Sequence, residues 1–416
     1  MRRLLFAAAI LLLSTTMGRA SGFSIYEASV RANGMLGAFT AYADHVSTIY
    51  FNPGGLAKLD GIRVSAGATV IAPRSSFRGP LPYSNTKYQM EDQNFFVPNF
   101  YASYQVMDGL TVGLGAYAPF GLGTKWEPDW VGRNLAIETA IETLFLNPSV
   151  GYTLPDFGIG DIHIGGGVMI GVVGKVKLNR YVSDVSPGGV FDLESEEFDN
   201  TPIGFNAGIL YEPHEMVSLG FTYRSEIETE FAGDADFGSL PASGFPTGIG
   251  GGTSITLPSN WVAAINVKPM QNLTVEIDYV WWGWSSYDEL VIEFDQAVPA
   301  LGGTELASER GYEDVWQIRG GVEYSEFGVP GLTLRGGLAY DKNPVPDEYL
   351  DPTLPDSDRL LFSGGLSYDI NEMIAIDAAY IFIRAEERES TSAEHGLDGV
   401  YNTYAHLPSL GLTLKL

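Results

Sequence analysis

Residues 269–282, PMQNLTVEIDYVWW, combine a tight turn with a strand that alternates strictly between apolar and polar side chains. The odd-numbered residues from Leu273 to Trp281 are all apolar, and Glu276 and Asp278 lie between them. A period of two places successive side chains on opposite faces of a β-strand. The stretch therefore predicts a strand with one apolar face and one charged face.

The same alternation recurs along the chain, and the connections between the strands are short and long in turn. The short ones span a few residues, as at 107–109 and 213–215, whereas long ones include 231–253 and 284–311. Outer-membrane β-barrels are built in this way, with short periplasmic turns and longer extracellular loops. We expect an all-β fold, a fourteen-stranded antiparallel transmembrane barrel with strands at approximately 62–71, 95–106, 110–118, 142–154, 161–182, 202–212, 216–230, 254–268, 272–283, 312–325, 331–341, 358–369, 373–387 and 402–416.

The N-terminus predicts export from the cytoplasm. Arg2 and Arg3 precede an unbroken apolar run, 4–13, and Gly18 and Ala20 supply the small residues expected before a cleavage site. The apolar run is too short for a membrane-spanning helix, which needs roughly 20 residues. We therefore expect a signal peptide at 1–20. No later stretch approaches that length, so a membrane protein of this sequence must be a closed barrel.

Composition excludes several classes of function. The net charge is −27, which argues against a nucleic-acid partner, because nucleic acids bind basic surfaces. The chain has five histidines and no cysteine, and no Ser/His arrangement predicts an enzyme. Four acids, Asp347, Asp351, Asp356 and Asp358, offer oxygen ligands for Ca²⁺, but their spacing matches no known calcium loop. We predict neither a metal site nor a cofactor.

Alternation alone does not decide which face of the barrel is apolar. A signal peptide, aromatic residues near strand ends such as Trp281 and Trp282, and charges on the alternate face all favour an apolar outer surface in the outer membrane of a Gram-negative bacterium. A soluble secreted β-protein and a general porin for small solutes are the alternatives. The barrel would occupy 61–416.

Residues 21–60 do not fit the strand pattern. Glycines punctuate the segment, and its aromatic residues need somewhere to be buried. We expect a small hatch inside the barrel rather than a disordered leader. Its turn Asn52-Pro53-Gly54 is a candidate hatch motif, because the Asn52 amide can bond the turn backbone and Pro53 fixes one φ angle.

Several short motifs in order resemble the outer-membrane long-chain fatty acid and aromatic-hydrocarbon transporter family (FadL/TodX type, OMPP1). They cover most of the chain: Gly22-Phe23, Phe51-Asn52-Pro53, Ala118 to Leu122, Trp130 to Arg133, Asn147-Pro148-Ser149, Asn206 to Glu212, Thr222 to Glu226, Leu257-Pro258, Trp282-Gly283-Trp284, Tyr340-Asp341, Pro344 to Pro346, and Leu354 to Arg359. The usual residue after Asn-Pro in this family is Ala, and here it is Gly54, which would loosen the turn.

The resemblance implies a fourteen-stranded barrel with an N-terminal hatch and passive uptake of hydrophobic molecules. It further implies sideways release through a gap made by a kinked third strand. Here that strand carries Gly113, Gly115, Pro119 and Gly121; glycine marks bends and proline cannot donate to the ladder, although Pro119 could also simply end the strand.

Two further sets of residues are candidate contacts for the transported molecule. Lys175 belongs to the densest basic cluster on any strand and falls where fatty-acid transporters place a carboxylate-contacting base. The family's other such base has no clean match; Ser308 falls near its place, and Arg310 lies two residues further on. A lysine in the lumen could instead pair with barrel carboxylates. The apolar residues Trp130, Leu135, Ile137 and Ile141 have mixed helical spacing and predict either a short amphipathic catch helix or ordinary loop packing.

We predict passive uptake of long-chain fatty acids, with aromatic hydrocarbons as the alternative cargo. Other expected partners are outer-membrane lipid with lipopolysaccharide and the barrel assembly machinery, and the barrel is expected to be a monomer.

Overall fold

The computed structural model describes residues 22–80, 84–182, 188–238, 240, 244–246, 248–390 and 396–416. The predicted signal peptide, 1–20, lies outside these residues. In the part of the chain that is described, no helix has the length and apolar character needed to cross a membrane.

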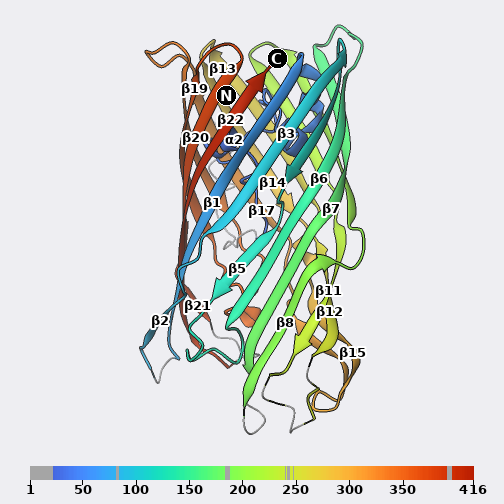
Figure 1. The fold of residues 1–416 in the computed structure, drawn as a ribbon. Coiled ribbons are helices and arrows are strands. Elements are labelled where there is room, and N and C mark those ends of the chain that lie inside the picture. Colours follow the sequence, from blue (N-terminus) through green and yellow to red (C-terminus); the bar gives the residue numbers. More distant parts are fainter. Residues whose placement is uncertain are drawn as a thin grey trace, which may run out of the picture.

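Fourteen antiparallel strands form a closed barrel (Figure 1). Each pairs with the next in the order given, and the last pairs with the first from Arg63 opposite Lys415 to Arg78 opposite Val400. The strands are β1 (Ile62–Arg78), β3 (Phe95–Met107), β4 (Leu110–Tyr117), β6 (Glu138–Thr153), β7 (Asp161–Val182), β9 (Ile203–His214), β10 (Val217–Arg224), β13 (Asn260–Met270), β14 (Leu273–Trp282), β17 (Val315–Tyr324), β18 (Leu332–Asp341), β19 (Arg359–Asp369), β20 (Ile374–Ala385) and β22 (Gly399–Lys415).

Shorter strands extend the barrel at the end opposite the tight turns, the lower end in Figure 1. They are β2 (Lys87–Gln89), β5 (Gly121–Lys125), β8 (Gly189–Phe198), β11 (Ile227–Asp236), β12 (Ile249–Leu257), β15 (Glu289–Val298), β16 (Gly303–Glu309) and β21 (Arg388–Ser390), with single 3₁₀ turns η3 (Trp284–Ser286) and η4 (Asp347–Tyr349). The tight turns and the C-terminus share the other end.

Two predicted strands, 216–230 and 254–268, are each divided in the structure. The first separates into β10 and β11 at Ser225, and the second into β12 and β13 beside Pro258. Pro258 has no N–H to continue a ladder. Beyond these points β11 pairs with β8 and β12 rather than with a barrel neighbour, so the expectation of continuous strands was wrong there.

The apolar face of the barrel points outward, as predicted. In β14, Ile277 is 53% exposed, whereas Glu276 and Asp278, on the opposite face, are completely buried. A soluble barrel would bury the apolar set instead. An outward apolar face over a charged interior is the arrangement of a barrel surrounded by lipid.

The segment 22–59 fills part of the barrel interior. It contains the short helices α2 (Val30–Asn33) and α3 (Thr48–Phe51) and the 3₁₀ helix η1 (Pro53–Lys58), and nearly all of its residues are buried. Phe39, Tyr50 and Phe51 cluster with Tyr101 of β3 and Tyr117 of β4. Side chains of the barrel wall therefore complete the hydrophobic core of this segment.

Ion pairs add a second attachment of this segment to the wall. Arg31 contacts Asp44 at 2.6 Å and Glu323 of β17 at 3.3 Å, and Arg335 of β18 donates to the same Glu323 at 2.7 Å. Tyr42 also donates to Glu323, at 2.7 Å. These buried charges satisfy one another, so each partner left alone would be strongly unfavourable.

Candidate functional site

The barrel wall is interrupted beside β3, where the neighbouring strand β4 ends and the chain continues to β5. Pairing of β3 with β4 ends at Phe100 opposite Ala116, and the chain resumes as β5, which pairs with β6 only. Residues 95–97 of β3 still pair with β1 on their other side. No strand continues the ladder with these β3 residues on the β4 side within the described parts of the chain.

The N-terminal segment takes up backbone groups at this interruption. Pro119 cannot donate, and its carbonyl accepts from the Ile25 amide at 2.8 Å; the Gly121 amide donates to the Phe23 carbonyl at 3.0 Å. The four groups join Phe23–Ile25 to 119–121 as a short antiparallel bridge. The kink expected at Pro119 and Gly121 thus coincides with the place where the hatch segment enters the wall.

Gly113 and Gly115, in contrast, lie in a regular part of β4. Both residues pair with β3 and β6. A Cβ at Gly113 would lie 2.7 Å from Ile49 Cδ1, and one at Gly115 would lie 3.0 Å from Ile49 Cγ2. These glycines therefore make room for Ile49 of the hatch segment, and the bend is at 118–121.

A cavity of about 570 Å³ occupies the interruption. Buried residues of the N-terminal segment, including Phe23 and Ile25, line it together with residues of β1, β3, β5, β6, β20 and β22. Its lining also includes residues of the outer surface, namely Phe96, which is 70% exposed, and Val173. The cavity thus extends from the barrel interior to the outer, lipid-facing surface.

One end of the cavity carries charged groups. Glu27 and Asp356 are buried and Arg359 is partly buried, and all three line the cavity. The Gly22 amide donates to Asp356 Oδ2 at 3.1 Å. Arg359 Nη2 lies 3.1 Å from Asp341 Oδ2. The remaining lining is mainly apolar, which suits a hydrophobic ligand with at most a small polar head.

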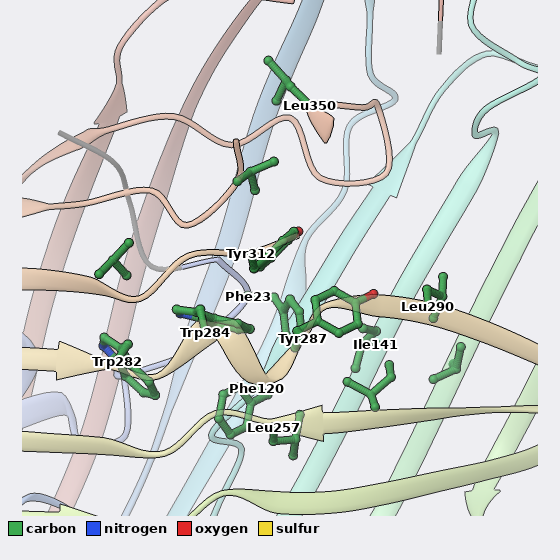
Figure 2. Packing of buried hydrophobic residues seen from close by; sticks show 14 of the residues in the cluster. Phe23, Phe120, Ile141, Leu257, Trp282, Trp284, Tyr287, Leu290, Tyr312 and Leu350 are labelled. Carbon is green, nitrogen blue, oxygen red and sulfur yellow. The ribbon is translucent and has the colours of Figure 1, made fainter. Parts of the chain in front are cut away.

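An aromatic cluster surrounds Phe23, which lines the cavity. Figure 2 shows the Phe23 ring among Trp284, Tyr287 and Phe120, at centroid distances of 4.7, 5.6 and 6.1 Å. A second, much smaller cavity of about 20 Å³ lies beside the first and shares Phe23 with it. The two cavities also share Leu122, Ile141 and Leu354, so Phe23 is one of four residues that line both spaces.

The predicted basic residues are not in the large cavity. Lys175 of β7 pairs in register with Glu142 and lies on the outer face with Val173, while its neighbours Gly174 and Val176 are buried. Arg310 lines the smaller cavity and forms an ion pair with Asp351 at 2.6 Å. The structure does not bring these two bases together.

The apolar residues 130–141 do not form a helix. Trp130 lies in a turn and stacks on Trp126 at 4.3 Å, Leu135 packs against the same cluster, Ile137 is buried just before β6, and Ile141 is part of β6. The expectation of an amphipathic catch helix was wrong. The alternative of loop packing describes Trp130, whose Nε1 donates to the Ala136 carbonyl at 2.8 Å.

The Asn52-Pro53-Gly54 turn is a tight joint between the hatch segment and the wall. Asn52 is fully buried; its Nδ2 donates to the carbonyls of Thr40 at 2.8 Å and Ile209 at 3.1 Å, and its Oδ1 accepts from the Gly54 amide at 3.0 Å. A Cβ at Gly165 would lie 2.1 Å from the Pro53 carbonyl oxygen. Gly165 therefore permits close packing of β7 against the turn, and the Asn52-Pro53-Gly54 turn is not loosened.

The loop acids bind protein groups. Asp351 pairs with Arg310, Asp347 with Arg388, and Asp358 accepts from Tyr340. Within the described ranges, no group of three or more metal-binding side chains is placed to hold an ion.

Glu27 and Arg359 were not predicted as site residues, and Asp356 was considered only as an oxygen ligand for Ca²⁺. Asp356 and Arg359 belong to the motif Leu354 to Arg359 used for the family resemblance, so that motif was the available signal. Nothing in the sequence near Glu27 marks it as a partner of residues more than 300 positions away.

Comparison with known proteins places the chain in a family. Residues 11–415 match the model of the outer membrane protein transport protein family (OMPP1/FadL/TodX). A long-chain fatty acid transport protein of Escherichia coli O6:H1 (strain CFT073) is 27% identical over 93% of this chain and 92% of its own length. The outer membrane protein P1 of Haemophilus influenzae is 23% identical over 91% of this chain and 89% of its own.

Two solved structures share the fold. The structure of a Pseudomonas aeruginosa FadL homologue has a TM-score of 0.81 at 20% identity, covering 95% of this chain and 99% of that one. The toluene transporter TodX of Pseudomonas putida has a TM-score of 0.70 at 15% identity, covering 96% and 99%. The chain belongs to the OMPP1/FadL/TodX family of non-enzymatic outer-membrane transporters of hydrophobic compounds in Gram-negative bacteria.

Proposed function

We propose that this protein takes up hydrophobic molecules by passive diffusion and releases them sideways, through the interruption between β3 and β5, into the outer membrane. One observation carries the proposal: a single, mainly apolar cavity is lined both by buried residues of the hatch segment and by the exposed Phe96 and Val173 of the outer surface. An apolar molecule in such a cavity can reach lipid without crossing a polar barrier.

Long-chain fatty acids are the first candidate cargo and aromatic hydrocarbons the second. Relatives named as long-chain fatty acid transport proteins support the first, at 27% identity over nearly the whole chain. The second is supported by the charged end of the cavity, where acids outnumber bases. A volume of about 570 Å³ suits either, since small-molecule sites range over ~300–1,000 Å³.

Deletion of the gene tests the proposal most simply. Uptake of oleate and of toluene should be measured in the deletion strain and in a strain complemented with the intact chain. We expect uptake of at least one compound to fall on deletion and to return on complementation. Unchanged uptake of both would refute the proposal.

A general porin is distinguished by electrical measurement. The buried segment 22–59 occupies the lumen, so the intact protein should not form large steady channels in a planar bilayer. Large, steady conductance would favour a porin over a transporter with a hatch.

A further inference from the structure

The charged residues that line the large cavity are mostly acidic. They are Glu27, Glu142, Asp356 and Arg359, that is, three carboxylates and one guanidinium among the described residues of the lining. Glu27 is 4% and Asp356 is 6% exposed, so neither is well screened by water. Glu142 is exposed on the outer side of the wall. The lining therefore carries an excess of negative charge.

The positive charge of Arg359 is already balanced by protein groups. Its Nη2 contacts Asp341 at 3.1 Å, and Asp341 is completely buried. Asp356 and Glu27 also interact electrostatically with Arg359. The guanidinium therefore brings no uncompensated positive charge to the cavity.

The two buried acids show how unfavourable a further negative charge would be. Burial raises the pKa of Glu27 to about 7, against the opposing effect of Arg359 and Arg319. Burial likewise raises the pKa of Asp356 above its ordinary value, with Asp341 contributing in the same direction. A ligand carboxylate beside these groups would lose the same hydration and would add like-charge repulsion.

Arg310, Arg319 and Lys175 do not supply a positive charge to the large cavity in place of Arg359. Arg310 is paired with Asp351 at 2.6 Å and lines only the smaller cavity. Arg319 Cζ lies 4.3 Å from the centroid of the Tyr26 ring, and Arg319 is not among the residues that line the large cavity. Lys175 lies on the outer face beside Glu142.

We propose that the charged end of this cavity selects against ionised carboxylates, so that the protein carries uncharged hydrophobic molecules and accepts a fatty acid only as its neutral acid. The selection rests on the proposed uptake function and specifies its substrate class. Glu27 and Asp356 are the residues that determine it.

Binding to the purified full-length protein tests the selection. Dodecanol and laurate have the same chain length and differ in head charge at about pH 8. Tryptophan fluorescence reports occupancy, because Trp284 packs against Phe23 of the cavity. We expect dodecanol to bind at least about tenfold more tightly than laurate, after correction for partition of each into detergent.

A double variant, Glu27→Gln with Asp356→Asn, should raise laurate affinity about tenfold and leave dodecanol affinity unchanged. The double variant Glu289→Gln with Glu293→Gln removes two carboxylates at exposed positions outside the cavity and should change neither affinity. Heat-modifiable migration on a gel checks that each variant is folded.

Laurate binding as tight as dodecanol binding in the unchanged protein would overturn the selection, whatever the variants do. A folded double variant with unaltered laurate affinity would also overturn it. Absence of binding by both compounds would instead contradict the uptake function itself.

Discussion

Replacement of Asn52 by Ala should weaken the joint between the hatch segment and the barrel. The side chain is fully buried and makes three hydrogen bonds, to Thr40, to Ile209 of β9 and from the Gly54 amide. Each bond contributes about 1 kcal/mol net, and a buried group left without a partner costs about 1–3 kcal/mol. Because two carbonyls and one amide lose their partner, we expect a loss of about 3 kcal/mol in the free energy of unfolding.

Urea unfolding in lipid vesicles, followed by tryptophan fluorescence, measures this loss. The bond to Ile209 is the one that joins the turn to the wall, so planar-bilayer conductance of Asn52→Ala should also rise. Asn52→Asp keeps the acceptor for Gly54 but cannot donate to either carbonyl, and it should resemble Asn52→Ala. The exposed Asn402→Ala is the matched control. Stability within about 0.5 kcal/mol of the unchanged protein, with unaltered conductance, would refute the reasoning.

Three further substitutions have defined outcomes. Burial raises the pKa of Glu27 from 4.5 to about 7, so the folded state holds the proton more tightly than the unfolded state; the contribution of Glu27 to stability should be fully present below about pH 4.5 and should fall by about 3 kcal/mol as the pH rises through 7. The urea midpoint should fall across this pH range, and Glu27→Gln should remove the part of the fall that comes from Glu27. Phe23→Ala should remove the ring contacts with Trp284 and Tyr287 and lower the free energy of unfolding by about 3 kcal/mol; a change within about 0.5 kcal/mol in urea unfolding would contradict this packing role of Phe23. Gly113→Val should destabilise the protein by about 1–3 kcal/mol because its Cβ would lie 2.7 Å from Ile49, whereas Gly336→Val has 3.6 Å of space and should be tolerated; equal effects on the melting temperature would refute the explanation.

The strands could be predicted closely because their signals are local. The predicted strand 95–106 corresponds to β3 at Phe95–Met107, and the predicted strand 272–283 corresponds to β14 at Leu273–Trp282. Alternation and turn residues are read within a few positions of each other. The divisions at Ser225 and Pro258 were missed because they depend on pairing outside the barrel ladder, of β11 with β8 and of β12 with β15.

Lys175 illustrates how one extra residue alters a site prediction. Phe145 pairs with Gly171 and Leu144 pairs with Val173, so Val172 is inserted as a bulge in β7. A one-residue shift exchanges the two faces of a strand. Before the bulge odd-numbered residues such as Met169 point inward, and after it even-numbered ones such as Val176 do. Lys175 therefore lies outside, although uniform alternation would have placed it in the lumen.

The charged end of the cavity was beyond sequence reasoning for a different reason. Glu27 meets Asp356 and Arg359 only because the hatch segment folds back into the barrel that the rest of the chain builds. Pro119, by contrast, has a local signal, because a residue without an N–H cannot continue a ladder. That signal alone could mean only the end of a strand, and the family resemblance was needed to expect a gap in the wall. The tertiary fold determines what lines the interruption.

Sideways release through this interruption is tested most directly by filling it. Gly121 lines the cavity, and a Cβ there would lie 2.6 Å from Ile25 Cδ1, so Gly121→Phe places a ring in the opening. Gly364→Phe makes the same change on the outer face of an intact wall, where no atom lies within 4 Å of the added Cβ. Uptake of oleate and toluene should be measured in a deletion strain that carries either variant. We expect folded Gly121→Phe to reduce uptake to the level of the deletion strain and Gly364→Phe to restore it fully; uptake by folded Gly121→Phe at the rate of the unchanged protein would contradict sideways release.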